Sequence, residues 1–316
     1  MSELRWHPFH QDWVITATHR QDRTFFPPDD YCPLCPTKDG GFPTEAPREN
    51  YDIAVFENKF PSLSTPPAEP AVESGELLAV RQSNGVCEVI SYTSEHTATI
   101  ADLPVSQIKK LTRVWRDRYI ELKSRPEVEY VFIFENKGRE IGVTLTHPHG
   151  QIYGYPYIPK VVEIRHEAER AHQNSHGRTL AADWLNDEIE DGRRIVFEHK
   201  NWIAVVPFFA RYPYEVHLGP KADTPDLESM GDEMLNGLAQ ALKDLTVKYD
   251  KLFGFSMPYI MSIFQFPAEH TRLIIEFTPP YRTKDKLKYL AGSEASCGAF
   301  ISDTLPEETA AQLRAL

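Results

Sequence analysis

Two histidines spaced two residues apart are the strongest candidates for chemistry in this sequence. They lie in the run Thr146-His147-Pro148-His149-Gly150-Gln151. Residues i and i+2 of an extended strand point to the same side, so His147, His149 and Gln151 are expected to share one face. Either both histidines bind a metal, or one binds a metal while the other is a free nucleophile or base. Packing both in a core is a poor alternative, because each buried ring needs partners for its two nitrogens.

A pair of cysteines provides half of a tetrahedral zinc site. Cys32 and Cys35 stand in the string Cys-Pro-Leu-Cys, and no second pair of this spacing exists. The other two ligands are therefore expected to come from the twelve histidines. A redox role would need a thioredoxin-like βαβ context, which the residues around position 32 do not provide. Four cysteines in 316 residues form no disulfide framework, so a reducing cytoplasm is expected.

Two further strings could bind phosphate. The first is a basic cluster formed by His19, Arg20 and Arg23. The arginine fork suits phosphate oxygens, although such a cluster alone is more often a solvated turn. The second string comprises Phe134-Glu135-Asn136-Lys137-Gly138, followed by Gly142 and Thr144. It is not a P-loop, since it lacks Gly-Lys-Ser/Thr. If the protein transfers phosphate groups, the transfer is therefore expected to run through histidine and not through a magnesium-bound triphosphate.

Charge and hydropathy exclude several classes of partner. The chain has 34 basic and 46 acidic residues, a net charge of −12. Nucleic acids and anionic membranes repel such a chain at long range. The N-terminal residues contain no apolar leader, and the longest apolar run, residues 202–210, is too short to span a bilayer and contains Pro207. We expect neither nucleic acid nor membrane as a partner.

Hydrophobic periodicity predicts a mixture of helices and strands. Residues 1–50 are expected to be rich in loops. Helices are expected over residues 104–126, 160–192 and 227–249 and from residue 306 onward. Strands are expected at residues 52–56, 77–81, 86–92, 129–135, 141–145, 151–157, 195–198, 202–206, 214–218, 259–266 and 271–277. Asn84-Gly85 predicts that the second and third of these strands form a hairpin.

The order of these elements repeats along the chain. Strands, one long helix and further strands occur in residues 51–157 and again in residues 195–279. The string EHTATIADLP before the first long helix resembles LGPKADTPDL before the second. We interpret the chain as two copies of one α+β unit, over residues 1–158 and 159–316, that together form one sheet. The alternative is two unrelated α+β domains.

Several strings resemble the galactose-1-phosphate uridylyltransferases, a branch of the histidine-triad superfamily. The most specific is FENKGREIGVTLTHPHGQIYGYPYIP, and others match the family in order: RWHPFHQDWVITATHRQDR, CPLC, FENKFPSL, EHTATIADLP and WIAVVPFFARYPYEV. The resemblance spans nearly the whole chain. It implies a duplicated histidine-triad-like fold, with an antiparallel sheet and helices packed on it, and an N-terminal half that carries the zinc site and the nucleophile.

The resemblance also implies a reaction and its residues. His149 matches the nucleophile, which takes the uridylyl group from UDP-glucose, releases glucose-1-phosphate and passes the group to galactose-1-phosphate in a ping-pong reaction. Gln151 matches the glutamine that binds the transferring phosphoryl oxygens. Positions that match nucleotide or phosphate contacts are Arg20, Arg23, Asn58, Asn136, Gly142, Thr144 and, near the substrate phosphate, Lys288. Positions that match the ligands of one structural zinc are Cys32, Cys35, His96 and His147.

The sequence also departs from the family pattern. Where some members carry a second metal, this chain has Arg165, Phe264, Ile274 and Glu276, so no second metal and a catalytically silent second half are predicted. Ser293 and Phe300 replace a tyrosine and a glutamine near the sugar, which leaves the accepting hexose open. The resemblance implies a homodimer whose active site borrows residues from the C-terminal half of the partner.

Two other functions remain open at this stage. One is a related nucleotidyltransferase or phosphorylase acting on ADP-sugars or dinucleoside polyphosphates. Relatives of that type tend to have serine where Gly150 stands, which favours the uridylyltransferase. The other is a zinc-stabilised nucleotide-binding protein without catalysis. A binding protein has no need of a free nucleophile, so His149 and Gln151 argue against it.

Overall fold

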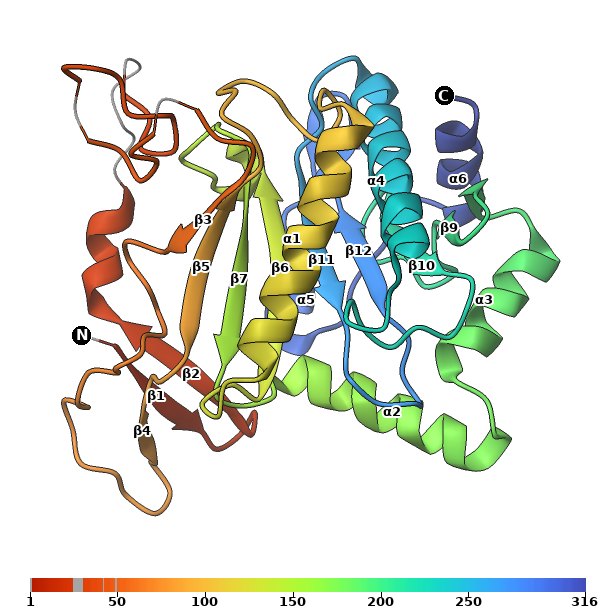
Figure 1. Ribbon diagram of the computed structural model, residues 1–316. Helices are drawn as coiled ribbons and strands as arrows, with labels where there is room; N and C mark the ends of the chain where they lie inside the picture. The colour runs from red at the N-terminus through yellow and green to blue at the C-terminus, as the bar shows by residue number, and fades with distance from the viewer. Residues whose placement is uncertain (1, 25–30, 42, 49) are drawn as a thin grey trace.

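A single antiparallel sheet runs through the molecule (Figure 1). The computed structural model describes residues 2–24, 31–41, 43–48 and 50–316 and, of residues 22–24, only the backbone. Within these residues the sheet has nine strands. In spatial order they are β3 (Ala54–Glu57), β5 (Val86–Ser91), β7 (His149–Tyr155), β6 (Tyr130–Lys137), β11 (Tyr259–Phe264), β12 (Ile274–Thr278), β10 (Val216–Pro220), β9 (Trp202–Val205) and β8 (Ile195–Glu198).

The strand order shows that the two halves have the same topology. In the first half the chain runs from β5 through a helix to β6 and β7, and β7 lies between the other two strands. In the second half it runs from β10 through a helix to β11 and β12, and β12 lies between. The halves meet where β6 pairs with β11, with Ile133 opposite Ile263. The predicted duplicated α+β fold and continuous sheet are therefore confirmed.

Two long helices, α1 (Val105–Lys123) and α4 (Asp232–Phe253), lie side by side on one face of the sheet (Figure 1). The helical spacing of apolar residues in α1 places one stripe against the strands, because residues three or four apart share a helix face. This stripe is at most 2% exposed and comprises Ile108, Leu111, Trp115, Tyr119 and Leu122. The helix predicted from residue 227 begins only at Asp232, because Gly231 is its N-cap and residues 227–230 form a preceding turn.

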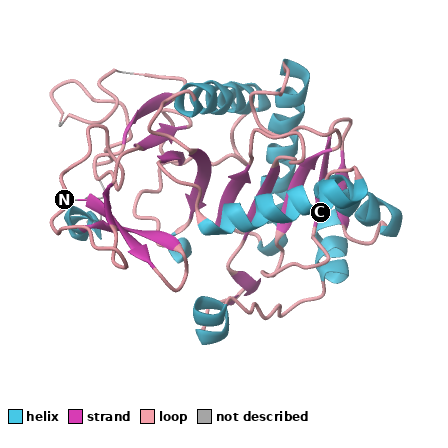
Figure 2. Ribbon diagram, turned by 90° about the horizontal axis from the view of Figure 1, so that it is seen from below, coloured by secondary structure: helices cyan, strands magenta, loops and turns pink. Residues whose placement is uncertain are grey.

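The opposite face is covered differently in the two halves. In the second half, α2 (Lys160–His176) and α3 (Leu180–Asp191) lie on this face, so Figure 2 shows helices on both sides of the sheet. In the first half a small sheet of β2 (Asp12–Ala17), β1 (Ser2–His7) and β4 (Val80–Gln82) packs there through Leu4 and Trp13. None of the described helices is long and apolar enough to cross a membrane.

One expectation for the N-terminal region holds in part and another was wrong. The described residues of 31–50 form loops as expected, but the chain before them contains the β1–β2 hairpin, in which Trp6 packs edge-on against Trp13 at 5.2 Å between ring centroids. The predicted hairpin around Asn84-Gly85 does not form, since β4 pairs with β1 whereas β5 pairs with β3 and β7. Gly85, at φ +148°, serves a close backbone approach instead, because a Cβ there would lie 2.4 Å from the carbonyl oxygen of Gly154.

A loop replaces the strand predicted over residues 141–145. A short 3₁₀ turn, η2 (Arg139–Ile141), is followed by irregular chain up to β7. Gly138 and Gly142 have φ values of +99° and +83°, which side-chain-bearing residues rarely adopt and which prevent an extended run. This loop lies beside the candidate active site.

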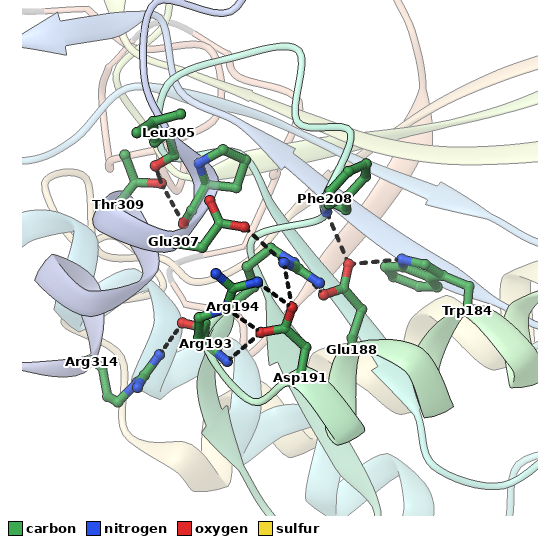
Figure 3. Close-up of polar contacts among 11 residues, drawn as sticks. Trp184, Glu188, Asp191, Arg193, Arg194, Phe208, Leu305, Glu307, Thr309 and Arg314 are labelled. Atoms are coloured by element: carbon green, nitrogen blue, oxygen red, sulfur yellow. Dashed lines mark hydrogen bonds and ion pairs between the residues drawn. The ribbon is translucent and has the colours of Figure 1, made fainter.

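Buried ion pairs attach the C-terminal helix α6 (Pro306–Arg314) to α3 (Figure 3). The guanidinium of Arg194 is 2.6 Å from Glu188, 3.0 Å from Asp191 and 2.7 Å from Glu307 of α6. Glu188 also accepts hydrogen bonds from the Trp184 indole and the Phe208 amide. Because Arg194 and Glu188 are 5% and 1% exposed, neither charge has access to solvent as an alternative partner.

We expect Arg194→Met to lower the free energy of unfolding by about 3 kcal/mol, because it leaves the buried Glu188 charge without its cation. Urea denaturation followed by circular dichroism measures this. Arg193→Met is the matched control, since the Arg193 side chain is 68% exposed and pairs only with Asp191 among the carboxylates described. Equal midpoints for both variants would show that the buried network contributes nothing to stability.

Candidate active site

His149 is the first residue of β7 and is paired with Ser91 of β5. Its Nδ1 lies 2.7 Å from the carbonyl oxygen of His147, which selects the tautomer whose Nδ1–H donates. The lone pair on Nε2 is then free for a partner outside the strand. Burial lowers the pKa of His149 below its ordinary value, which favours the neutral ring. A neutral and oriented imidazole is the form of histidine that acts as a nucleophile.

Four potential metal ligands lie together beside this strand. The ligand atoms of Cys32, Cys35, His96 and His147 all lie within 4.8 Å of one another. Sγ of Cys35 is 3.3 Å from Nδ1 of His96 and 3.5 Å from Nδ1 of His147. Zinc bonds of about 2.3 Å to sulfur and about 2.1 Å to nitrogen place tetrahedral neighbours roughly 3.6 Å apart. The donor set and its spacing therefore fit a tetrahedral transition-metal ion.

The electrostatics of the cysteine pair also favour a cation. Burial, and after it the neighbouring Cys32, raises the pKa of the Cys35 thiol to about 12. At neutral pH this thiol would keep its proton, whereas a metal-bound thiol is deprotonated. A divalent cation between the two sulfurs would remove the repulsion that opposes ionisation.

Hydrogen bonds orient His147 so that Nδ1 faces the cysteines. Its Nε2 lies 2.7 Å from the carbonyl oxygen of Thr93 and 3.0 Å from the hydroxyl of Tyr51. Tyr51 also contacts Ser91 Oγ at 2.7 Å and donates to the Leu34 carbonyl at 2.6 Å. Such outer contacts fix the tautomer of a metal-binding histidine. Both ring nitrogens of His147 are therefore engaged.

The sequence analysis missed Tyr51, Ser91 and Thr93. Their residue types are ordinary for a strand end and a loop, so nothing in the sequence marks them. They reach His147 because β5 pairs with β7 in a register that sets Ser91 opposite His149. These three residues could have been identified only if the register between β5 and β7 had been known.

Gln151 lies two residues further along the same face of β7 and is 6% exposed. Its Oε1 accepts from Asn58 Nδ2 at 3.2 Å and from the Tyr153 hydroxyl at 3.3 Å. Asn58 is itself fixed, because its Oδ1 accepts from the Phe60 amide at 2.9 Å. With its oxygen engaged, the amide nitrogen of Gln151 is available to donate to a ligand.

A cavity of about 860 Å³ opens in front of His149 and Gln151. This volume falls in the range of small-molecule sites. Among the residues predicted to contact substrate, it brings together Arg20, Asn58, Asn136, Gly142 and Thr144. Apolar side chains also line it, namely Leu34, Phe56, Phe60, Val89, Ile141 and Leu145. The cavity thus joins an apolar wall to amide, hydroxyl and guanidinium groups.

A second cavity of about 410 Å³ is lined in part by the loop that precedes β7. It shares Asn136, Val143, Leu145 and His149 with the first and adds the basic side chains of Lys137 and Arg139. His149 therefore borders two spaces, and the irregular loop over residues 142–146 contributes to the lining of both.

Two predicted contacts are not placed in the larger cavity. The side chain of Arg23 lies outside the described residues, although its backbone belongs to η1 (Thr18–Thr24) next to Arg20. Lys288 is 8% exposed and is not among the described residues that line either cavity. Its Nζ donates to the Ile301 carbonyl at 2.5 Å and lies 3.4 Å from Glu294.

The second half carries different chemistry at the matching positions. Ile133 opposes Ile152 in one half and Ile263 opposes Ile275 in the other, so the register assigns Arg272 to the place of His149. Arg272 forms an ion pair with Asp223. The second half therefore lacks a histidine at the position of the candidate nucleophile.

A second group of potential ligands lies in this half: Glu215, His217 and Glu276. Although its three ligand atoms are close together, Glu276 already pairs with Arg165 and, at 2.7 Å, with Arg211. His217 and these two arginines lower the pKa of Glu276 to about 2 despite its burial. The guanidinium groups supply the positive charge that a metal ion would otherwise bring.

Comparisons with known proteins agree on one family. Residues 1–159 match the profile of the galactose-1-phosphate uridyl transferase N-terminal domain, and residues 165–316 match that of the C-terminal domain. A galactose-1-phosphate uridylyltransferase of Thermotoga maritima is 40% identical over 320 residues, covering 99% of this chain and 98% of the relative. One of Haemophilus influenzae is 32% identical, covering 99% and 93%.

Solved structures share the fold. The structure of a uridylyltransferase matches with a TM-score of 0.89 and 34% identity, covering 99% of this chain and 97% of that chain. An ADP-glucose phosphorylase from Arabidopsis thaliana has the same fold, with a TM-score of 0.73 at 21% identity over 100% of this chain and 99% of that chain.

We expect the purified protein to contain one equivalent of a transition metal, measured by elemental mass spectrometry, and Cys35→Ser to lose most of it. Cys297→Ser is the control, because this exposed thiol lies outside the cluster. Two equivalents, with one retained in Cys35→Ser, would instead place a metal at the group around Glu276.

Proposed function

This chain belongs to the galactose-1-phosphate uridyl transferase family, and from this we propose that it transfers a uridylyl group between hexose-1-phosphates through a covalent intermediate on His149. The orientation of His149 carries the proposal. Its Nδ1 is committed to the His147 carbonyl, and the ring borders two cavities. Nε2 is thereby left as the nucleophile.

The reaction consists of two displacements at phosphorus. In the first, Nε2 of neutral His149 attacks the α-phosphorus of UDP-glucose, an N–P bond forms, and the P–O bond to glucose-1-phosphate breaks. In the second, a phosphate oxygen of galactose-1-phosphate attacks the uridylyl-histidine and the N–P bond breaks, giving UDP-galactose and the free imidazole. Splitting the transfer in this way avoids having both sugar phosphates bound at once.

The cavity supplies groups for an anionic substrate despite the acidic chain. The Gln151 amide donates to a non-bridging oxygen of the transferring phosphoryl group, where negative charge builds up. Arg20 lines the cavity and offers its guanidinium to phosphate oxygens, and Asn58 holds Gln151 in place. Asn136, Gly142 and Thr144 offer an amide, an open backbone and a hydroxyl beside the nucleophile.

We assign zinc to the cluster of Cys32, Cys35, His96 and His147. Bound there, the ion would have four protein ligands and no open position, which is typical of a structural site. It would join the loop around residue 32 to the start of β7. Because both thiols must stay reduced, we propose a cytoplasmic location.

The C-terminal region supports a homodimer. Lys288 lies beside exposed apolar side chains, among them Tyr289, which is 75% exposed, and Leu290, which is 47% exposed. Since Lys288 lines neither cavity among the described residues, we propose that this region completes the cavity of a second copy.

The covalent intermediate is tested by intact-protein mass spectrometry at neutral to alkaline pH after mixing with UDP-glucose alone. We expect a gain of one uridylyl group that disappears on adding galactose-1-phosphate. His149→Ala should show no gain while keeping its metal, and His176→Ala, at the exposed end of α2, should behave as wild type. An adduct formed with ADP-glucose but not with UDP-glucose would instead assign the protein to the nucleotidyltransferases or phosphorylases that act on ADP-sugars.

The shared active site is tested by mixing two inactive variants, His149→Ala and Lys288→Ala. Random exchange of subunits in equal amounts makes half of the dimers mixed, and each mixed dimer has one intact site. Activity should therefore recover to roughly one quarter of wild type. No recovery after verified subunit exchange would mean that His149 and Lys288 act within one chain or not in one site.

A further inference from the structure

We propose that Tyr92, held by the carboxyl group of Glu135, is a positioning residue that fixes the backbone on both sides of His149 and so sets the direction of its imidazole. The inference rests on the proposed function, because it assigns to His149 the attack on phosphorus. The sequence analysis gave Tyr92 no role, and it named Glu135 only as one residue of the string over residues 134–138.

Tyr92 contacts both neighbours of His149. It follows β5 directly, and its backbone amide donates to the Pro148 carbonyl at 3.0 Å. Its phenol oxygen lies so close to Gly150 that an added Cβ there would be 2.2 Å away. The side chain is fully buried. One residue thus limits how far the backbone can move before and after the nucleophile.

Glu135 holds the far end of this tyrosine. Its Oε2 accepts from the Tyr92 hydroxyl at 3.4 Å, and its Oε1 accepts from the Tyr259 hydroxyl at 3.3 Å. It lies on β6 among Val131 and Ile133, on the face packed against the long helices, and is 4% exposed. The carboxyl group therefore connects the Tyr92 hydroxyl to the Tyr259 hydroxyl of β11.

A carboxyl group at this buried position lowers the stability of the folded protein. Burial raises the pKa of Glu135 to about 7, which reflects the unfavourable transfer of its charge from water. Stability alone would favour an apolar residue like its neighbours Val131 and Ile133. A group that opposes folding, lines the smaller cavity and holds Tyr92 is better explained by its effect on the site.

The direction of the His149 ring depends on this backbone. The hydrogen bond from Nδ1 to the His147 carbonyl fixes the ring relative to the backbone just before His149. If residues 148–150 shift, Nε2 turns relative to the phosphorus. Misplacing a reacting group by about 1 Å can slow a reaction by about a hundredfold.

Tyr259 provides a matched control. It donates to the same carboxyl group and is also fully buried, but it lies on β11, where its ring packs against Phe277 and near Lys137. No described contact joins its side chain to residues 148–150. Loss of either hydroxyl disturbs Glu135, yet only loss of the Tyr92 hydroxyl removes a contact beside His149.

The test measures formation of uridylyl-His149 in the metal-loaded protein by rapid quench at varied UDP-glucose. We expect Tyr92→Phe to slow the limiting rate about tenfold, with half-saturation changed less than about twofold, and Tyr259→Phe to stay within about twofold of wild type. Equal loss in both variants, or a change in half-saturation only, would overturn the inference. If wild type itself forms no adduct, the proposed function fails and the inference with it.

Combining substitutions at Glu135 and Tyr92 distinguishes a positioning role from a general loss of stability. Glu135→Gln keeps an oxygen for the Tyr92 hydroxyl and should retain more activity than Glu135→Leu. In the Tyr92→Phe background both changes should have little further effect on the rate, whereas independent effects would multiply. Multiplying effects contradict the proposed link.

A reciprocal pair keeps the inference testable if Glu135 variants fold poorly. Gly150→Ala should slow adduct formation because the new methyl group meets the Tyr92 oxygen. Removing that oxygen in the double variant Gly150→Ala with Tyr92→Phe should restore part of the rate. A double variant slower than Gly150→Ala alone would show that the hydroxyl does not control the position of this backbone.

Discussion

The pairing of β5 with β7 is the constraint on which the active site depends. It sets the segment Ser91–Thr93 alongside His147–Gly150, and each residue of this segment has a separate contact. Ser91 meets the Tyr51 hydroxyl, Tyr92 bonds to the Pro148 carbonyl, and the Thr93 carbonyl faces the His147 ring. A slip of one residue would turn every side chain of β7 to the other face and separate the potential metal ligands from the candidate nucleophile.

Duplication explains why only one half has to meet this constraint. The shared register matches Arg272 to His149, and Arg272 forms an ion pair with Asp223. At the matching place in the second half, α2 lies on the sheet, held by the ion pair between Arg165 and Glu276, and leaves a space of only about 20 Å³. Two copies in one continuous sheet share a hydrophobic core, so one copy can use its face for packing while the other keeps its face open for ligands.

Much of the fold follows from local patterns in the sequence. The spacing of apolar residues identified α1 because one stripe of that helix is fully covered. The run from Thr146 to Gln151 identified the site because its residues are contiguous in the sequence, where the chain enters β7 at His149. The pairing of β4 with β1 was not predictable, since Asn84-Gly85 gives the same local signal whether it turns a hairpin or crosses between sheets. The loop over residues 142–146 depends on left-handed glycines, which apolar alternation does not reveal.

The two histidines show what sequence could not decide. Alone, the run His-Pro-His allows both rings to bind a metal or one ring to act as a nucleophile. The hydrogen-bond partners of the two rings distinguish their roles. Both nitrogens of His147 are engaged, Nε2 by Thr93 and Tyr51 and Nδ1 toward Cys35. Among the described residues, His149 has a partner only for Nδ1, and that partner is the carbonyl of His147 itself. A cation held by Cys35 and His147 would fix the His147 ring and with it the peptide that orients His149, so the proposed zinc would influence catalysis through geometry.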